Sequence, residues 1–161
     1  MATTKLIGGF LKLLECHTAL GMESGEISDT QIKASSEFDS SHGAIHGRLH
    51  CETVWRSATL YGNQWLQVDL GNHGSSTITR VATQGGNFYN AWVTKYKLQH
   101  SNDEINFQYY RELGQIAHKV RYTESKCRYL VTLVSRHVAR PASRKCYVVL
   151  QVLTGFNEAK D

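Results

Sequence analysis

Three histidines recur at intervals of four residues in the first third of the chain: His42, His46 and His50. On one α-helix this spacing would align three imidazoles, which are common ligands of zinc. Gly43 and Gly47 lie between them, and glycine disfavours the helix that such a site would need. The segment therefore does not predict a metal centre.

Patterns typical of catalysis are also not found. Asp69 and Glu112 are isolated acids near the ends of expected strands, and no pair of carboxylates is spaced for acid–base catalysis. The chain contains no G-x-S-x-G, phosphate-binding loop, dinucleotide-binding fingerprint or H-E-x-x-H motif. The sequence favours a protein that is not an enzyme and needs no cofactor, and it leaves calcium dependence open.

The four cysteines are Cys16, Cys51, Cys127 and Cys146. None forms a C-x-x-C pair, which disfavours a zinc ribbon or a thioredoxin-like site. An even number at wide spacing fits disulfides in a secreted protein, with three possible connectivities. Four buried free thiols in an intracellular protein would fit equally well, because free cysteine is readily buried.

The net charge of +4 is unevenly distributed along the chain. Residues 1–115 carry nine Lys/Arg and eleven Asp/Glu, a net −2, and residues 116–161 carry nine and three, a net +6. A basic last third suits an anionic partner such as phospholipid, sulfated glycan or nucleic acid. A solvated surface that keeps the protein in solution is the alternative.

The length of 161 residues and the 41% hydrophobic content predict one globular domain. Residues 65–70 and 92–100 alternate between apolar and polar, which is typical of strands with one buried face. In the second run, Lys95, Lys97 and Gln99 form the expected wet face. In residues 77–83, Ile78 and Val81 are out of phase, which predicts a β-bulge or burial on both faces.

Three more strands are expected: residues 107–113, and the nearly continuous Val/Leu runs 128–134 and 147–154. Continuous apolar runs suit central strands. Many short strands without a convincing long helix predict an all-β sandwich or barrel. No run approaches the ~18 apolar residues of a membrane-spanning helix, and the apolar residues 6–14 resemble a degraded signal or a short amphipathic helix.

Four segments together resemble the discoidin family, also called the coagulation factor V/VIII C-type domain. They occur in family order and at family-like spacing. The segments are CHTALGMESGEISDTQIKASS at 16–36, NQWLQVDLG at 63–71, ITRVATQG at 78–85 and WVTKYKLQHSND at 92–103. The resemblance is strong over residues 16–113 and weaker beyond.

The resemblance implies a jelly-roll-like β-sandwich, a distorted eight-stranded barrel with binding loops projecting at one end. Its members are non-catalytic extracellular modules that bind anionic phospholipid, glycans, collagen or protein receptors. The implied domain covers residues 16–155, of which 116–155 diverge, between an extension at 1–15 and a tail at 156–161.

The chain departs from the family at its end, where Phe156 stands in place of the cysteine expected after Gly155. Cys16 would then lose its usual partner. In a family-like layout, the strand after Cys127 begins near the end of the last strand. The resemblance therefore implies a Cys16–Cys127 disulfide.

Three loops are candidates for binding in this layout. The candidate residues are Phe38, Asp39, Ser40 and His42 in the first loop, Asn87, Phe88, Tyr89 and Asn90 in the second, and Arg140 and Arg144 in the third. Aromatic residues at loop tips can enter a membrane interface or stack on a sugar, and arginines attract anions.

Each loop also has a purely structural interpretation. Phe38 could fold back into the core, Phe88 and Tyr89 could close the end of the barrel, and the basic loop could be merely solvated. The leading hypothesis is nevertheless an extracellular module that binds glycan or an anionic membrane surface. The alternative is a protein–protein adhesion domain that binds collagen or a receptor, whereas a nucleic-acid partner is not favoured because the basic end lacks interleaved aromatics.

Overall fold

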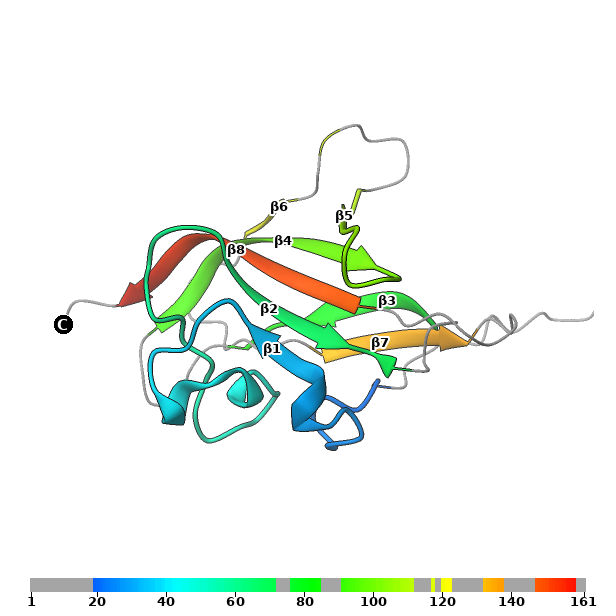
Figure 1. Ribbon diagram of the computed structural model, residues 1–161, viewed down its shortest axis with the longest axis horizontal. Helices are drawn as coiled ribbons and strands as arrows, with labels where there is room; N and C mark the ends of the chain where they lie inside the picture. The colour runs from blue at the N-terminus through cyan, green and yellow to red at the C-terminus, as the bar shows by residue number, and fades with distance from the viewer. Residues whose placement is uncertain are drawn as a thin grey trace, which may run out of the picture.

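The computed structural model of the chain describes residues 19–71, 76–84, 91–111, 117, 120–122, 132–137 and 147–158. These residues form two antiparallel sheets that face each other as a sandwich (Figure 1). The larger sheet has the order β1-β2-β8-β4-β5, with β6 also pairing with β4, and the smaller sheet pairs β3 with β7. The strands are β1 (Ile32–Ala34), β2 (Gln64–Asp69), β3 (Ser76–Ala82), β4 (Ala91–Ser101), β5 (Gln108–Tyr109), β6 (Val120–Tyr122), β7 (Thr132–His137) and β8 (Tyr147–Glu158). The predicted all-β sandwich is confirmed.

The helices that the structure describes are three short 3-10 turns that precede β2: η1 (Asp29–Gln31), η2 (Ser40–His42) and η3 (Ala44–His46). Among the described residues, no helix is long and apolar enough to span a membrane.

The core lies between the two sheets and follows the alternation of apolar residues in β2. Leu66 and Val68 are buried, as is Leu70, which directly follows the strand. They join the inward-facing Leu150 and Val148 of β8, which are their partners in the register. A period of two places every second side chain of a strand on the same face. The alternation seen in the sequence therefore correctly identified the face of β2 that packs on the core.

The strand β8 lies between β2 and β4, and its residues from Tyr147 to Val152 are buried on both faces. The continuous apolar run had predicted a central strand, and this is confirmed. The bulge predicted in β3 is also confirmed, because the register with β7 shifts between Ile78 and Arg80. The bulge lets both Ile78 and Val81 pack against the core.

Three predicted strands differ in length from the observed ones. The strand expected at 128–134 is described from Thr132 and continues to His137, since Arg136 pairs with Thr77 of β3. Of the strand expected at 107–113, the described residues 107–111 contain only β5, which is in register with Gln99 and His100 of β4. The last strand runs past Gly155 to Glu158, because the long β4 offers partners as far as Ala91.

The face of β4 that was predicted to be exposed to solvent is less exposed than expected. Lys95, Lys97 and Gln99 are each half-buried. The reason is tertiary for two of them, because Tyr109 of β5 lies beside Lys97 and Gln151 of β8 lies beside Gln99.

Strand directions define two ends of the sandwich. The loop end is made of residues 35–63, which follow β1 and precede β2, and in Figure 1 it lies at the same end as the start of β4 and the end of β8. The far end holds the end of β4, the start of β8 and residues 102–107. The candidate site is at the loop end.

Candidate functional site

The Phe38 loop (residues 37–44) is held in one shape by its own acidic side chains. The Glu37 carboxylate accepts a hydrogen bond from the backbone N–H of Ala44 at 2.7 Å. Gly43 lies so close to this carboxylate that a Cβ there would approach it within 3.2 Å. Asp39 precedes η2 and accepts a bond from the N–H of Ser41 at 2.9 Å, which is the usual role of an N-cap.

The side chain of His42 supports this loop from inside. Its Nδ1 lies 2.7 Å from Asp39 Oδ1, and only 13% of its side chain is exposed. This hydrogen bond is the main reason why the pKa of Asp39 lies below its ordinary value. Ser40 is exposed at the start of η2. The structure therefore places Ser40 and Asp39 at the surface and His42 beneath them.

Phe38, near the start of the loop, is 50% exposed, so it is not a core residue. The guanidinium carbon of Arg56 lies 4.2 Å from the centre of its ring, within the range of a cation–π interaction. The ring of His42 meets it edge-on at 6.0 Å between centroids. The backbone N–H of Phe38 also donates to the carbonyl of Arg56 at 2.8 Å. A large apolar surface and a cation are thus presented together.

A second loop, residues 55–64, packs beside the first. Trp55 Nε1 donates to the carbonyl of Ser36 at 3.0 Å, and Ser36 Oγ donates to Gln64 Oε1 at 2.6 Å. Gln64 Nε2 in turn donates to the carbonyl of Tyr61 at 3.0 Å. These bonds join the two loops at the start of β2.

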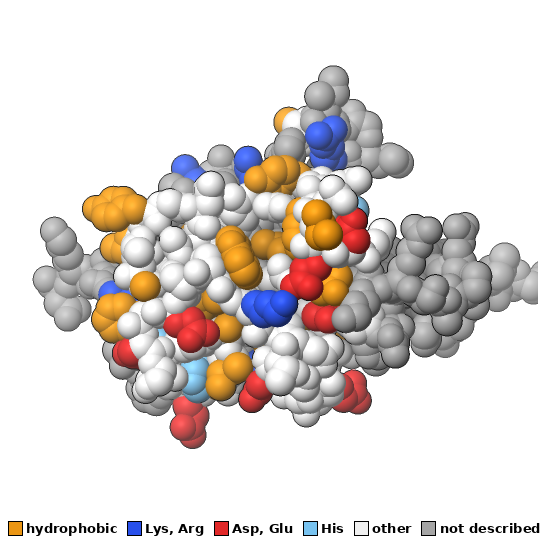
Figure 2. Space-filling model, viewed as in Figure 1, with side chains coloured by type: hydrophobic (Ala, Val, Ile, Leu, Met, Phe, Trp, Pro, Cys, Tyr) orange, Lys and Arg blue, Asp and Glu red, His pale blue; other side chains and the backbone are white. Residues whose placement is uncertain are grey.

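This second loop carries two exposed apolar side chains that the sequence reasoning missed. Tyr61 is 85% exposed, and its neighbour Leu60 is 46% exposed. Hydrophobic side chains project from this end of the molecule in Figure 2. The sequence did contain a signal for Tyr61, because Gly62 and Asn63 follow it and favour a turn. Phe88 and Tyr89 were selected as candidates for the same reason, since they are aromatic residues among turn-forming residues.

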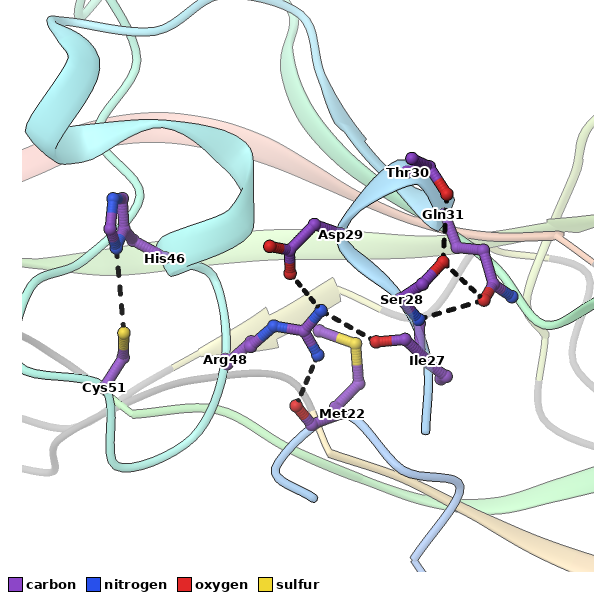
Figure 3. A network of polar contacts seen from close by, with 9 residues as sticks. All are labelled: Met22, Ile27, Ser28, Asp29, Thr30, Gln31, His46, Arg48 and Cys51. Atoms are coloured by element: carbon purple, nitrogen blue, oxygen red, sulfur yellow. Dashed lines mark hydrogen bonds and ion pairs between the residues drawn. The ribbon is translucent and has the colours of Figure 1, made fainter. Parts of the chain in front are cut away.

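Arg48 fastens the N-terminal segment to the base of the Phe38 loop. Its guanidinium donates to the carbonyls of Met22 at 2.8 Å and Ile27 at 2.7 Å, and it pairs with Asp29 at 2.6 Å (Figure 3). Only 14% of the Arg48 side chain is exposed. The backbone carbonyls of the buried residues Met22 and Ile27 thereby have a hydrogen-bond donor, as buried polar groups generally do.

Gly47, next to Arg48, is fixed by close packing. A Cβ at this position would lie 2.7 Å from Leu66 Cδ2 and 2.9 Å from the carbonyl oxygen of Ala44. The loop end is therefore bound to the core strand β2 as well as to the N-terminal segment.

The three regularly spaced histidines do not share a helix. His42 and His46 belong to separate 3-10 turns, and His50 has a left-handed backbone with φ of 57°. Within the described ranges, no group of three potential metal ligands comes together. Cys51 is a free thiol, and its Sγ lies 3.7 Å from His46 Nδ1 (Figure 3).

The other candidate residues lie outside the described part of the chain: Cys16, Cys127, Asn87, Phe88, Tyr89, Asn90, Arg140 and Arg144. Residues 87–90 lie between Ala82 and Ala91 in the sequence, and these described strand ends lie at the loop end. Arg140 and Arg144 lie between His137 and Tyr147, and these described strand ends lie at the far end (Figure 1).

A family model described as the F5/8 type C domain matches residues 31–141. The chain belongs to the F5/8 type C domain family. Retinoschisin from Mus musculus is 37% identical over 109 residues, which cover 61% of this chain and 48% of the relative. Coagulation factor V from Sus scrofa is 34% identical over 114 residues, which cover 65% of this chain and 5% of the relative.

Lactadherin from Rattus norvegicus is 31% identical over 110 residues, which cover 62% of this chain and 25% of that protein. The chain thus spans about half of retinoschisin and much less of the other two relatives. Among solved structures, CpGH89CBM32-5 from Clostridium perfringens, in complex with GalNAc-beta-1,3-galactose, is similar with a TM-score of 0.56. The alignment covers 86% of this chain and 90% of that chain at 17% identity, which shows the shared fold.

Proposed function

We propose that this F5/8 type C domain is a non-catalytic, extracellular recognition module whose loop end binds anionic phospholipid surfaces. The observation that carries the proposal is the half-exposed ring of Phe38 with the Arg56 guanidinium 4.2 Å from its centre. An aromatic side chain can enter the interface of a bilayer, while a cation beside it is attracted to the headgroups.

The neighbouring loop supports the same function. Tyr61 and Leu60 project from a loop that hydrogen bonds hold against the base of the Phe38 loop. Exposed apolar groups on a rigid support lose little conformational entropy when they bind, which favours affinity. The membership in the F5/8 type C family is consistent with this function, because the family includes binding modules for phospholipid.

A second candidate is a glycan at the same loop end. The related fold of CpGH89CBM32-5, solved with GalNAc-beta-1,3-galactose, favours it, as does the 85% exposure of Tyr61, whose ring is accessible for stacking on a sugar. A protein–protein adhesion domain remains the alternative if neither ligand binds.

The test is co-sedimentation with vesicles of phosphatidylcholine alone and of phosphatidylcholine mixed with phosphatidylserine, with and without calcium. We expect binding to the anionic vesicles, and an about tenfold weaker affinity for Phe38→Ala and for Tyr61→Ala, since each truncation removes on the order of 1–2 kcal/mol of apolar burial. Ile105→Ala is the matched control, because Ile105 is an 80% exposed apolar residue at the far end.

Equal losses for Ile105→Ala and Phe38→Ala would contradict a site at the loop end. If the chain does not sediment with anionic vesicles but the same loop variants weaken binding to GalNAc-beta-1,3-galactose, the glycan function replaces the membrane function.

A further inference from the structure

The outer face of the larger sheet, opposite the core, has an unusual composition. Because Leu66 and Val68 face the core, their neighbours Trp65 and Gln67 face outward from β2. By the same alternation Gln151 faces outward from β8 and Gln99 from β4. We name Gln67, Gln99 and Gln151, with Trp65 and Tyr109 beside them, the amide face.

The side chains of Gln67 and Gln151, at the centre of this face, are largely buried. Gln67 is 6% exposed and Gln151 is 9% exposed, although antiparallel sheets commonly have one solvated face. The outward-facing Val149 between them is also buried. In Figure 2, which shows this side of the molecule, uncharged side chains and backbone lie over β8, with a cation and carboxylates beside them toward the end of β2.

Each of these two glutamine side chains forms hydrogen bonds through only one of its two amide atoms, Oε1 or Nε2. Gln151 Oε1 accepts hydrogen bonds from Gln99 Nε2 at 2.9 Å and from the Tyr109 hydroxyl at 2.6 Å, whereas its Nε2 has no partner among the described residues. Gln67 Nε2 donates to Glu104 Oε1 at 2.9 Å, and within the same described set its Oε1 accepts no bond. Neither atom is among the fully buried side-chain atoms of the described residues that lack a partner, so both reach the solvent and are open to a ligand.

The register places the two free groups close to each other. Gln67 pairs with Val149, so Gln151 is its diagonal neighbour on the same face, and such neighbours lie about 7–8 Å apart. Trp65 pairs directly with Gln151, which sets a half-buried indole beside the free donor. A ligand that lies on this face therefore meets an aromatic ring, a donor and an acceptor.

We propose that the amide face is a second binding site and that its ligand is a neutral saccharide. A sugar ring stacks its C–H face on an aromatic side chain, and its hydroxyl groups both donate and accept hydrogen bonds, as the free ends of Gln67 and Gln151 require. Side-chain amides fix orientation in such sites without carrying charge.

The charges on this face argue for a neutral ligand. Lys33 Nζ pairs with Glu104 at 2.5 Å, and Lys97 Nζ lies 5.0 Å from the centre of the Tyr109 ring. Both cations are therefore engaged by neighbouring groups. An extended peptide fits less well, because it would add to the edge of a sheet and not to its face.

The test is nuclear magnetic resonance of the whole chain, in which the side-chain amide signals of Gln67 and Gln151 are followed during titration. The probes are lactose, N-acetyllactosamine, maltotriose, xylotriose and GalNAc-beta-1,3-galactose. We expect at least one of them to shift both amide signals. Gln151→Met, which keeps the length of the side chain, should weaken that binding about tenfold, the effect of losing one or two hydrogen bonds.

Glu23→Gln, at an exposed position of the N-terminal segment, is the control and should leave the saccharide affinity unchanged. The side-chain amide signals of Gln67 and Gln151 separate this site from the loop end. Shifts confined to residues of the loop end, or no shift with any probe, would overturn the proposal. If Gln151→Met does not fold, the shifts of the unaltered chain still decide, and vesicle binding tests the loop end independently.

Discussion

The two ends of the sandwich are built in the same way but differ in the group that lies against their exposed apolar residue. At the loop end, Glu37 and Asp39 accept backbone N–H bonds that shape the Phe38 loop. At the far end, Asp103 accepts N–H bonds from Ile105 at 2.9 Å and Asn106 at 2.8 Å. Short acidic side chains commonly stabilise turns by this kind of bond.

The difference lies in what surrounds the exposed apolar residue. Phe38 lies between the acids Glu37 and Asp39 in the sequence but has the Arg56 guanidinium over its ring, whereas Ile105 directly follows Asp103 and Glu104. The cation–π contact therefore puts a positive charge at the apolar contact point of the loop end, and an anionic surface is attracted to that charge. Exposed apolar area alone therefore does not distinguish the two ends, and we expect the cation beside Phe38 to do so.

The largest effect is expected for Arg48→Ala, which removes the support of the loop end. The substitution leaves the carbonyls of Met22 and Ile27 without their donor, and it should lower the free energy of unfolding by about 3 kcal/mol. Urea denaturation measures the change, and Arg111→Ala, at an exposed position, is the control. A loss no greater than that of the control would show that the loop end does not depend on Arg48.

An intermediate effect is expected for Arg56→Gln, which removes the cation but keeps a polar side chain. One cation near an anionic leaflet contributes about 1 kcal/mol, so affinity for phosphatidylserine vesicles should fall about fivefold. The difference should shrink as salt is added, because salt screens exposed charges. Lys97→Gln, on the outer face of the sheet, should have little effect, and an equal effect would mean that charge acts without regard to position.

The smallest effect is expected for Asp103→Asn at the far end. Hydrogen bonds from Asn106 and Ile105 hold the pKa of Asp103 well below its ordinary value. A carboxyl with a depressed pKa in the folded state stabilises the protein above its unfolded pKa of about 4, and this contribution is lost as the pH falls through the folded pKa.

Asp103→Asn should therefore be less stable than the unaltered chain at pH 7, and the two should converge as the pH falls below about 4. Urea midpoints measured between pH 7 and pH 2 check this. A stability difference that stays constant over that range would contradict a role for the ionised carboxylate. Vesicle binding at pH 7 should not change, since Asp103 lies at the end that we do not expect to bind.

Much of the fold could be predicted because it depends on local pattern. The alternation in 65–70 identified the core face of β2, and the phase change between Ile78 and Val81 identified the bulge in β3. The length of β5 and the burial of Lys95, Lys97 and Gln99 could not be predicted in this way. They depend on which strand lies alongside, and that is a property of the assembled sheet.

The candidate site also has features that the sequence could predict and features that only the structure revealed. The sequence by itself determined that Phe38 lies in a polar loop and that the chain resembles a family of binding modules, because turn residues and motif spacing are local features. Only the tertiary structure brought Arg56 onto the Phe38 ring, placed Tyr61 beside that loop and left one end of Gln151 unpartnered among the described residues. These contacts join residues that are distant in sequence, and their geometry exists only when the backbone hydrogen bonds and the core have fixed the strands in register.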